Sequence, residues 1–118
     1  MLNLSHKNLD VYKLSKDLVK EIYLLTSNFP KDEIYGLTNQ LRRASISVPS
    51  NIAEGLSRGT NKDINRFIVI ARSSLVEIDT QIEIALSLNY LNGENITKLE
   101  EFIVRIFQML SKLIKHYR

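Results

Sequence analysis

Residues 64–88 read INRFIVIARSSLVEIDTQIEIALSL, and this stretch decides the fold class. Its apolar residues recur every three or four positions, which is the spacing of an α-helix, whereas strand-like alternation is absent. One line of them, from Ile64 to Ala85, has the steps of a helix-bundle core. Successive residues of a helix are rotated by about 100°, so a second line of residues lies largely on a different face of the helix from the first. This second line comprises Phe67, Ile70, Ser74, Glu77, Gln81, Ile84 and Leu88.

The rest of the chain shows the same helical periodicity. Only four glycines and two prolines occur in 118 residues, so we expect long helices over about 9–27, 35–57, 61–91 and 95–117. Thr60 with Asp63 forms a capping pattern at the start of the third. The sequence therefore predicts a single all-α domain over residues 1–118, an antiparallel up-and-down four-helix bundle.

Pro49 lies inside the second predicted helix. An interior proline removes one backbone hydrogen bond and clashes with the carbonyl four residues earlier, that of Ser45, at a cost of about 3 kcal/mol. We therefore expect this helix to be kinked at Pro49. Two shorter helices are the alternative.

Composition limits the functions open to the chain. There are no cysteines, which excludes disulfides, thiolate metal ligands and cysteine nucleophiles and is typical of a reducing compartment. The first ten residues lack the apolar segment of a signal peptide, and the longest apolar run, residues 67–71, is too short to span a bilayer. We expect a cytoplasmic protein without membrane contact. The net charge of +3 permits a polyanionic partner but does not establish one.

Two patterns could support catalysis, and each has a structural alternative. Residues 55–59 match the G-x-S-x-G pattern of a hydrolase nucleophile elbow, but a helix precedes them where that motif needs a strand, so we favour an interhelical turn. Glu54 and Glu77 could form an acid–base pair, but we favour a polar network that fixes helix register. Its members are Asn51, Glu54, Ser74, Glu77 and Gln81.

The histidines do not change this interpretation. His6 and His116 lie near the two termini and form no familiar zinc set without a cysteine or a third histidine. We predict no catalytic residue, no metal site, no cofactor and no enzymatic activity.

Basic residues concentrate in the middle of the chain. Arg58, Lys62 and Arg66 are spaced by four, which aligns the latter two on one helix face beside the turn. They could contact nucleic-acid phosphates, or they could be a solvated face with local ion pairs. The candidate phosphate contacts are Arg42, Arg43, Arg58, Lys62 and Arg66.

The second line on residues 64–88 bears on assembly. A helix in an isolated small bundle needs one apolar stripe, so a second stripe indicates either deep burial or contact between copies of the chain. We favour an oligomer, because exposed apolar surface usually marks an interface. The predicted seam contains Phe67, Ile70, Ile84 and Leu88.

Residues 37–55, LTNQLRRASISVPSNIAEG, closely resemble the 23S rRNA-intervening-sequence protein family, also called four helix bundle proteins. The same family pattern continues at Phe29-Pro30, Phe67, Ala71, Ser74, Leu75, Glu77, Gln81, Tyr90 and Leu91. The resemblance implies a bacterial, cytoplasmic, non-enzymatic bundle assembled as a homopentamer. A related bundle is the accessory protein of diversity-generating retroelements, a basic pentameric barrel that partners a reverse transcriptase and nucleic acid.

Together these patterns predict a non-enzymatic homo-oligomeric module, pentameric on the family resemblance, that binds structured RNA or another nucleic acid through its phosphates. The alternative is a protein–protein interaction scaffold without nucleic-acid binding. Salt separates the two, because phosphate binding weakens steeply as salt rises and an apolar docking surface does not.

Overall fold

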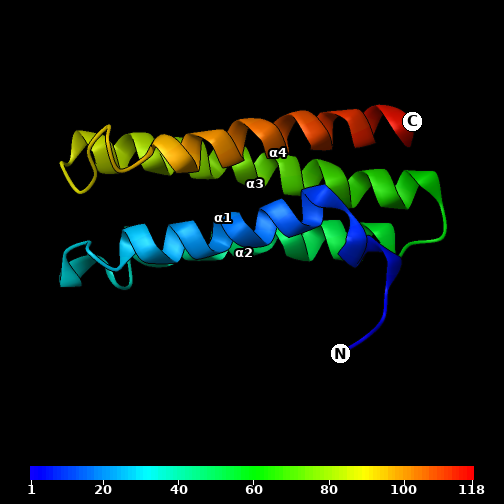
Figure 1. Cartoon of the computed structure of the whole chain (residues 1–118), viewed down its shortest axis with the longest axis horizontal. Helices are drawn as coiled ribbons and strands as arrows, with labels where there is room; N and C mark the ends of the chain where they lie inside the picture. Colours follow the sequence, from blue (N-terminus) through cyan, green and yellow to red (C-terminus); the bar gives the residue numbers. More distant parts are fainter.

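The computed structural model describes all 118 residues and contains four α-helices and no strand. Each helix packs against the next one along the chain, and α1 closes the bundle by packing on α4 (Figure 1). The predicted all-α four-helix bundle is confirmed. The helices are α1 (Asp10–Thr26), α2 (Leu37–Leu56), α3 (Asn61–Ser87) and α4 (Thr97–His116), with 3-10 turns η1 (Ser5–Asn8) and η2 (Lys31–Glu33).

The predicted core faces form the interior. On α2 the apolar residues at helical spacing, Leu37, Leu41, Ala44, Val48 and Ile52, are buried, and on α3 the predicted core line is buried from Ile68 to Ala85. All four helices contribute side chains without exposed surface, among them Leu18, Ile22, Leu41, Val48, Ile78, Leu99, Ile106 and Leu110. No helix combines the length and the apolar character that crossing a membrane requires.

The ends of α3 follow from local chemistry. Thr60 begins the helix by accepting a hydrogen bond from the backbone N–H of Asp63 at 3.2 Å, as the capping pattern predicts. At the other end Asn89 adopts the left-handed conformation, with φ of 62°. The N–H groups of Asn89 and Tyr90 then return to the carbonyls of Leu86 and Ala85, which is a Schellman motif. The helix therefore ends at Ser87, before the predicted residue 91.

Beside this end of α3, Glu33 forms hydrogen bonds that link the α1–α2 connection to the α3–α4 connection. One carboxylate oxygen accepts the N–H of Leu37 at 3.2 Å, in the first turn of α2. The other accepts the hydroxyl of Tyr90 at 2.8 Å. That hydrogen bond, with burial, raises the pKa of the Tyr90 phenol above its ordinary value of 10.0. The link holds the α1–α2 and α3–α4 connections at one end of the bundle, on the left in Figure 1.

Pro49 does not divide the second helix. α2 is one continuous helix of 20 residues with Pro49 inside it, so the alternative of two shorter helices is wrong. The kink near Pro49 itself stays a prediction.

The last turn of α2 approaches α3 closely at Gly55. A β-carbon added to Gly55 would lie 2.8 Å from the Cβ of Phe67 and 3.1 Å from the carbonyl oxygen of Ile64. Neither atom belongs to the flexible end of a side chain, so neither can move away easily. Glycine at position 55 therefore permits the α2–α3 contact that precedes the turn.

Gly55→Ala should destabilise the bundle by about 1–3 kcal/mol, because the new methyl group overpacks this contact. Gly59→Ala is the matched control, since nothing lies within 4 Å of its β-position and its φ is not positive. We expect the control to stay within about 0.5 kcal/mol of the wild type. Urea unfolding measures both, and equal losses from the two variants would contradict the close approach.

Candidate functional site

The α2–α3 turn lies at the same end of the bundle as the C-terminus of α4 and the start of α1, on the right in Figure 1. Ser57, the central residue of the G-x-S-x-G pattern, donates its hydroxyl to the carbonyl of Glu54 at 2.7 Å. It follows the helix α2 rather than a strand. The strand-turn-helix geometry of a nucleophile elbow is therefore missing: Gly55 and Leu56 end α2, and residues 57–59 lie in the interhelical turn.

Two guanidinium groups lie against the ring of Phe67. The Cζ atom of Arg58 is 4.7 Å from the ring centroid, and that of Arg66 is 5.0 Å from it. Both are within the range of cation–π attraction. Arg58 also forms an ion pair with Glu54, one turn earlier on α2. The aromatic ring thus brings together Arg58 from the turn and Arg66 from α3.

Beside this pair, a hollow of about 560 Å³ lies between the start of α3 and the end of α4. Its lining carries three cations, Lys62, Arg66 and Arg118, and no acidic residue. Val69, Ile70 and Tyr117 supply apolar surface, and Asn61 and Asn65 supply amides. The Oδ1 atom of Asn65 is buried and has no hydrogen-bond partner. Sequence reasoning missed Arg118, although a run of basic residues near the end of the chain signals it.

Arg42 and Arg43 lie elsewhere. Arg42 is half-buried between α1 and α2, where its Nε donates to the Thr26 hydroxyl at 3.0 Å and its Cζ lies 4.5 Å from the Tyr23 ring centroid. Arg43 is exposed. From Arg42, α2 runs about 21 Å to its end at Leu56, and Arg58 lies in the turn beyond. The structure therefore brings together Arg58, Lys62 and Arg66 and leaves the other two candidates apart.

The expected polar network divides into separate pieces within the chain. Ser74 of α3 pairs with the Ser47 hydroxyl of α2 at 2.9 Å, and the Asn51 amide donates to that same hydroxyl at 2.9 Å. Glu77 and Gln81 are joined only by a long 3.5 Å contact, and Oε1 of the buried Gln81 has no partner. The link through Ser47 was missed because a serine is not a conspicuous residue in a helix sequence.

Glu54 has a different environment from the one expected. Its side chain is 52% exposed and pairs with Arg58 rather than with Asn51, Ser74 or Glu77. Glu77 is also exposed, on the far side of Ser74 from that ion pair. No group of histidine, aspartate or glutamate side chains is arranged to hold a metal ion.

Three of the four predicted seam residues are exposed apolar side chains. Ile70, Ile84 and Leu88 keep 42%, 44% and 48% of their surface accessible. Phe67 is half-buried, under the two arginines. The second stripe of α3 is therefore not explained by deep burial within a single chain.

The model of one protein family, the 23S rRNA-intervening sequence proteins, matches residues 7–112 of the chain. The chain belongs to this family. No curated protein matches it. Among solved structures, the fold is similar to a Bacteroides thetaiotaomicron protein with unknown function from the S23 ribosomal protein family. The TM-score is 0.79 at 20% identity, over 89% of this chain and 98% of the other. That likeness supports the bundle fold of this family member.

The two polar sites predict unequal stability losses in this member of the 23S rRNA-intervening sequence proteins. Ser74→Ala removes the partly buried hydrogen bond between α2 and α3 and should cost about 1 kcal/mol. Glu54→Gln removes only an exposed ion pair and should cost less than that. Denaturant unfolding of both variants measures the difference. A larger loss for Glu54→Gln would mean that Glu54 has a buried partner.

Proposed function

We propose that the protein is a non-enzymatic, cytoplasmic, homo-oligomeric module that binds structured RNA through phosphate contacts at the α2–α3 end of the bundle. The observation that carries the proposal is the hollow lined by Lys62, Arg66 and Arg118 without an acidic residue. Neither Lys62 nor Arg118 has an ion-pair partner in the chain. Cations that line one hollow without an acidic side chain among them attract an anion, and phosphates are the anions that nucleic acid presents.

The start of α3 adds to this attraction. The first turn of a helix has backbone N–H groups without intrahelical partners, and the helix dipole is positive at that end. Thr60 takes the N–H of Asp63 at 3.2 Å, and the preceding N–H groups of the turn remain available. Amides at Asn61 and Asn65 supply further donors. Phosphate is suited to a site that combines these donors with cations.

The proposed assembly multiplies such sites. Apolar side chains at Ile70, Ile84 and Leu88 are exposed along one side of α3, next to the polar contacts between α2 and α3. Burying them against another copy would remove this surface from water. The family resemblance favours five copies. Repeated basic ends would then raise the avidity for one RNA above the affinity of a single site.

Ile84→Lys should break the oligomer, because it places a charge in the middle of the apolar seam. Leu24→Lys is the matched control, on α1 and 66% exposed, away from the seam. Light scattering at micromolar concentration should give a multiple of the 13.6 kDa chain mass for the wild type and the control, and a smaller species for Ile84→Lys. A monomeric wild type would defeat the proposed assembly.

Lys62→Ala with Arg66→Ala should weaken RNA binding and flatten its dependence on salt. Each lost phosphate contact removes about one unit from the slope of log affinity against log salt, irrespective of RNA sequence. Lys20→Ala with Lys31→Ala loses the same charge from exposed positions elsewhere and should keep the slope. Titrations of structured RNA at several salt concentrations, at matched oligomeric state, provide the measurement. If the Lys62→Ala, Arg66→Ala variant keeps the salt slope of the wild type, this end of the bundle is excluded as the RNA site.

The second candidate is a scaffold that docks a partner protein. An exposed apolar groove between α3 and α4, lined by Val76, Val104 and Phe107, favours it. Wild-type protein that binds no structured RNA at low salt would place this candidate first.

A further inference from the structure

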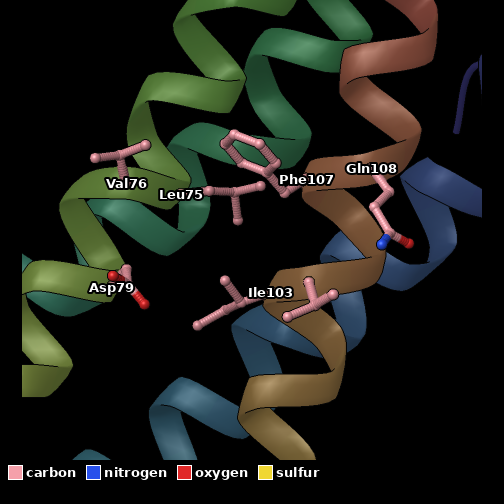
Figure 2. A pocket seen from close by; sticks show the side chains of 7 residues that line it. Leu75, Val76, Asp79, Ile103, Phe107 and Gln108 are labelled. Atoms are coloured by element: carbon pink, nitrogen blue, oxygen red, sulfur yellow. The ribbon is translucent and has the colours of Figure 1, made fainter.

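The α3–α4 groove is apolar at its centre. Figure 2 shows Phe107 reaching from α4 toward α3, with Leu75 and Val76 opposite it and Ile103 one turn away. The hollow has a volume of about 310 Å³. Val76 and Val104 each keep 54% of their surface exposed, and Phe107 keeps 39%. These side chains lie near the middle of both helices and form an uncovered apolar patch on the outer face of the bundle.

Carboxylates lie beside this patch on the side toward the α3–α4 connection. A second hollow continues from the first and shares Asp79, Ile103 and Val104 with it. Its lining adds Glu83 and Glu100, one from each helix, and contains no cation. All three carboxylates are exposed and none has an ion-pair partner in the chain. They are not arranged to hold a metal ion. This end of the α3–α4 face is therefore negative and uncompensated.

Cations lie beside the patch on the other side, toward the start of α3 and the end of α4. Arg72 lies over the Phe107 ring at 5.6 Å and donates to the Ser111 hydroxyl at 3.2 Å, one turn beyond the apolar centre. Lys62, Arg66 and Arg118 then line the hollow at the start of α3. Because α3 and α4 are antiparallel, the basic half of each helix lies beside the basic half of the other, and the acidic halves also coincide (Figure 1).

We infer that this face is a docking surface for the same face of a second copy of the chain, turned by a two-fold axis that passes near Val76. The rotation reverses the direction of α3 and α4, so the basic end of one copy meets the acidic end of the other. The apolar patches meet at the centre. Such an isologous contact needs one self-complementary surface, with apolar groups at the axis and opposite charges equally far from it on either side.

The spacing of the charges fits this requirement. Arg72 lies four residues before Val76, about 6 Å along α3, and Asp79 lies three residues after it, about 5 Å. Their midpoint is within one residue of Val76. The rotation therefore brings Arg72 of each copy opposite Asp79 of the other. The molecule measures 44 × 28 × 21 Å, so a face along its long axis offers roughly the 800 Å² per partner of a standard interface.

Charge also decides between occupants of this face. A nucleic acid would find phosphate attraction at the basic end and repulsion at Asp79, Glu83 and Glu100, so it cannot cover the whole length. This contact is separate from the seam of Ile70, Ile84 and Leu88, which lies on the α2 side of α3, and it does not depend on RNA binding.

Cysteine crosslinking reports the contact directly, because the chain has no native cysteine. Val76→Cys places a thiol near the proposed axis, where its own counterpart lies within reach of a short bismaleimide crosslinker. We expect a covalent dimer on a denaturing gel at low salt, without RNA. Leu24→Cys, 66% exposed on α1, is the control and should give little dimer.

Charge reversal identifies the register. In the Val76→Cys protein, Arg72→Glu sets acid against acid and Asp79→Arg sets base against base, so each should lower the crosslinking yield about tenfold. When the two variants are mixed, one of them with a size tag, opposite charges face each other again on both sides of the axis, and the tagged–untagged dimer should return. Asp79 is exposed and Arg72 is half-buried, and circular dichroism verifies that each variant folds.

Dimer from Val76→Cys, its loss in each reversal and its return in the mixture would establish the contact. Equal yields from Val76→Cys and Leu24→Cys, or a mixture no better than the single reversals, would overturn it. Since no RNA is present and the seam residues are unchanged, neither result decides the proposed RNA binding or the seam.

Discussion

The close packing of α2 on α3 is the constraint on which the other features depend. A glycine at position 55 lets the last turn of α2 approach the backbone of α3, where any β-carbon would overlap Phe67. Two turns earlier, the Ser47 and Ser74 hydroxyls join across the same interface. The close contact at Gly55 and the hydrogen bond between the serines together fix the axial position of α3 relative to α2.

This register sets the position of the basic end. With Gly55 against Phe67, the ring of Phe67 is held beside the turn, and the guanidinium groups of Arg58 and Arg66 lie 4.7 Å and 5.0 Å from its centroid. Lys62 is left facing the end of α4, next to Arg118. The arginines are thus held by a hydrophobic ring rather than by carboxylates, apart from the exposed pair with Glu54. Cations positioned in this way keep most of their charge available to a partner.

The antiparallel arrangement also distributes charge along the whole molecule. Within α3 the basic residues come early and the acidic residues other than Asp63 come late, while in α4 the order is opposite except at Lys98. Packing the two helices antiparallel adds like charges together at each end instead of cancelling them. The α3–α4 face therefore has a positive end, an apolar centre and a negative end. A parallel arrangement of the same two helices would have given a face of mixed charge.

The sequence by itself determined the helices and their buried faces, because a 3.6-residue periodicity is a local property that each segment carries alone. It also indicated the capping of α3 by Thr60 and the exposed stripe through Ile84. It could not determine which basic residues gather, since Arg42 lies near the start of α2 and Arg58 lies in the turn after it, and the neighbours of each depend on how the other helices pack. The engagement of Arg42 with Thr26 and Tyr23, the exposure of Glu54 and the part played by Ser47 all depend on how neighbouring helices are placed. Only the tertiary structure decided these features, because contacts between helices depend on their relative rotation and shift, which no single segment encodes.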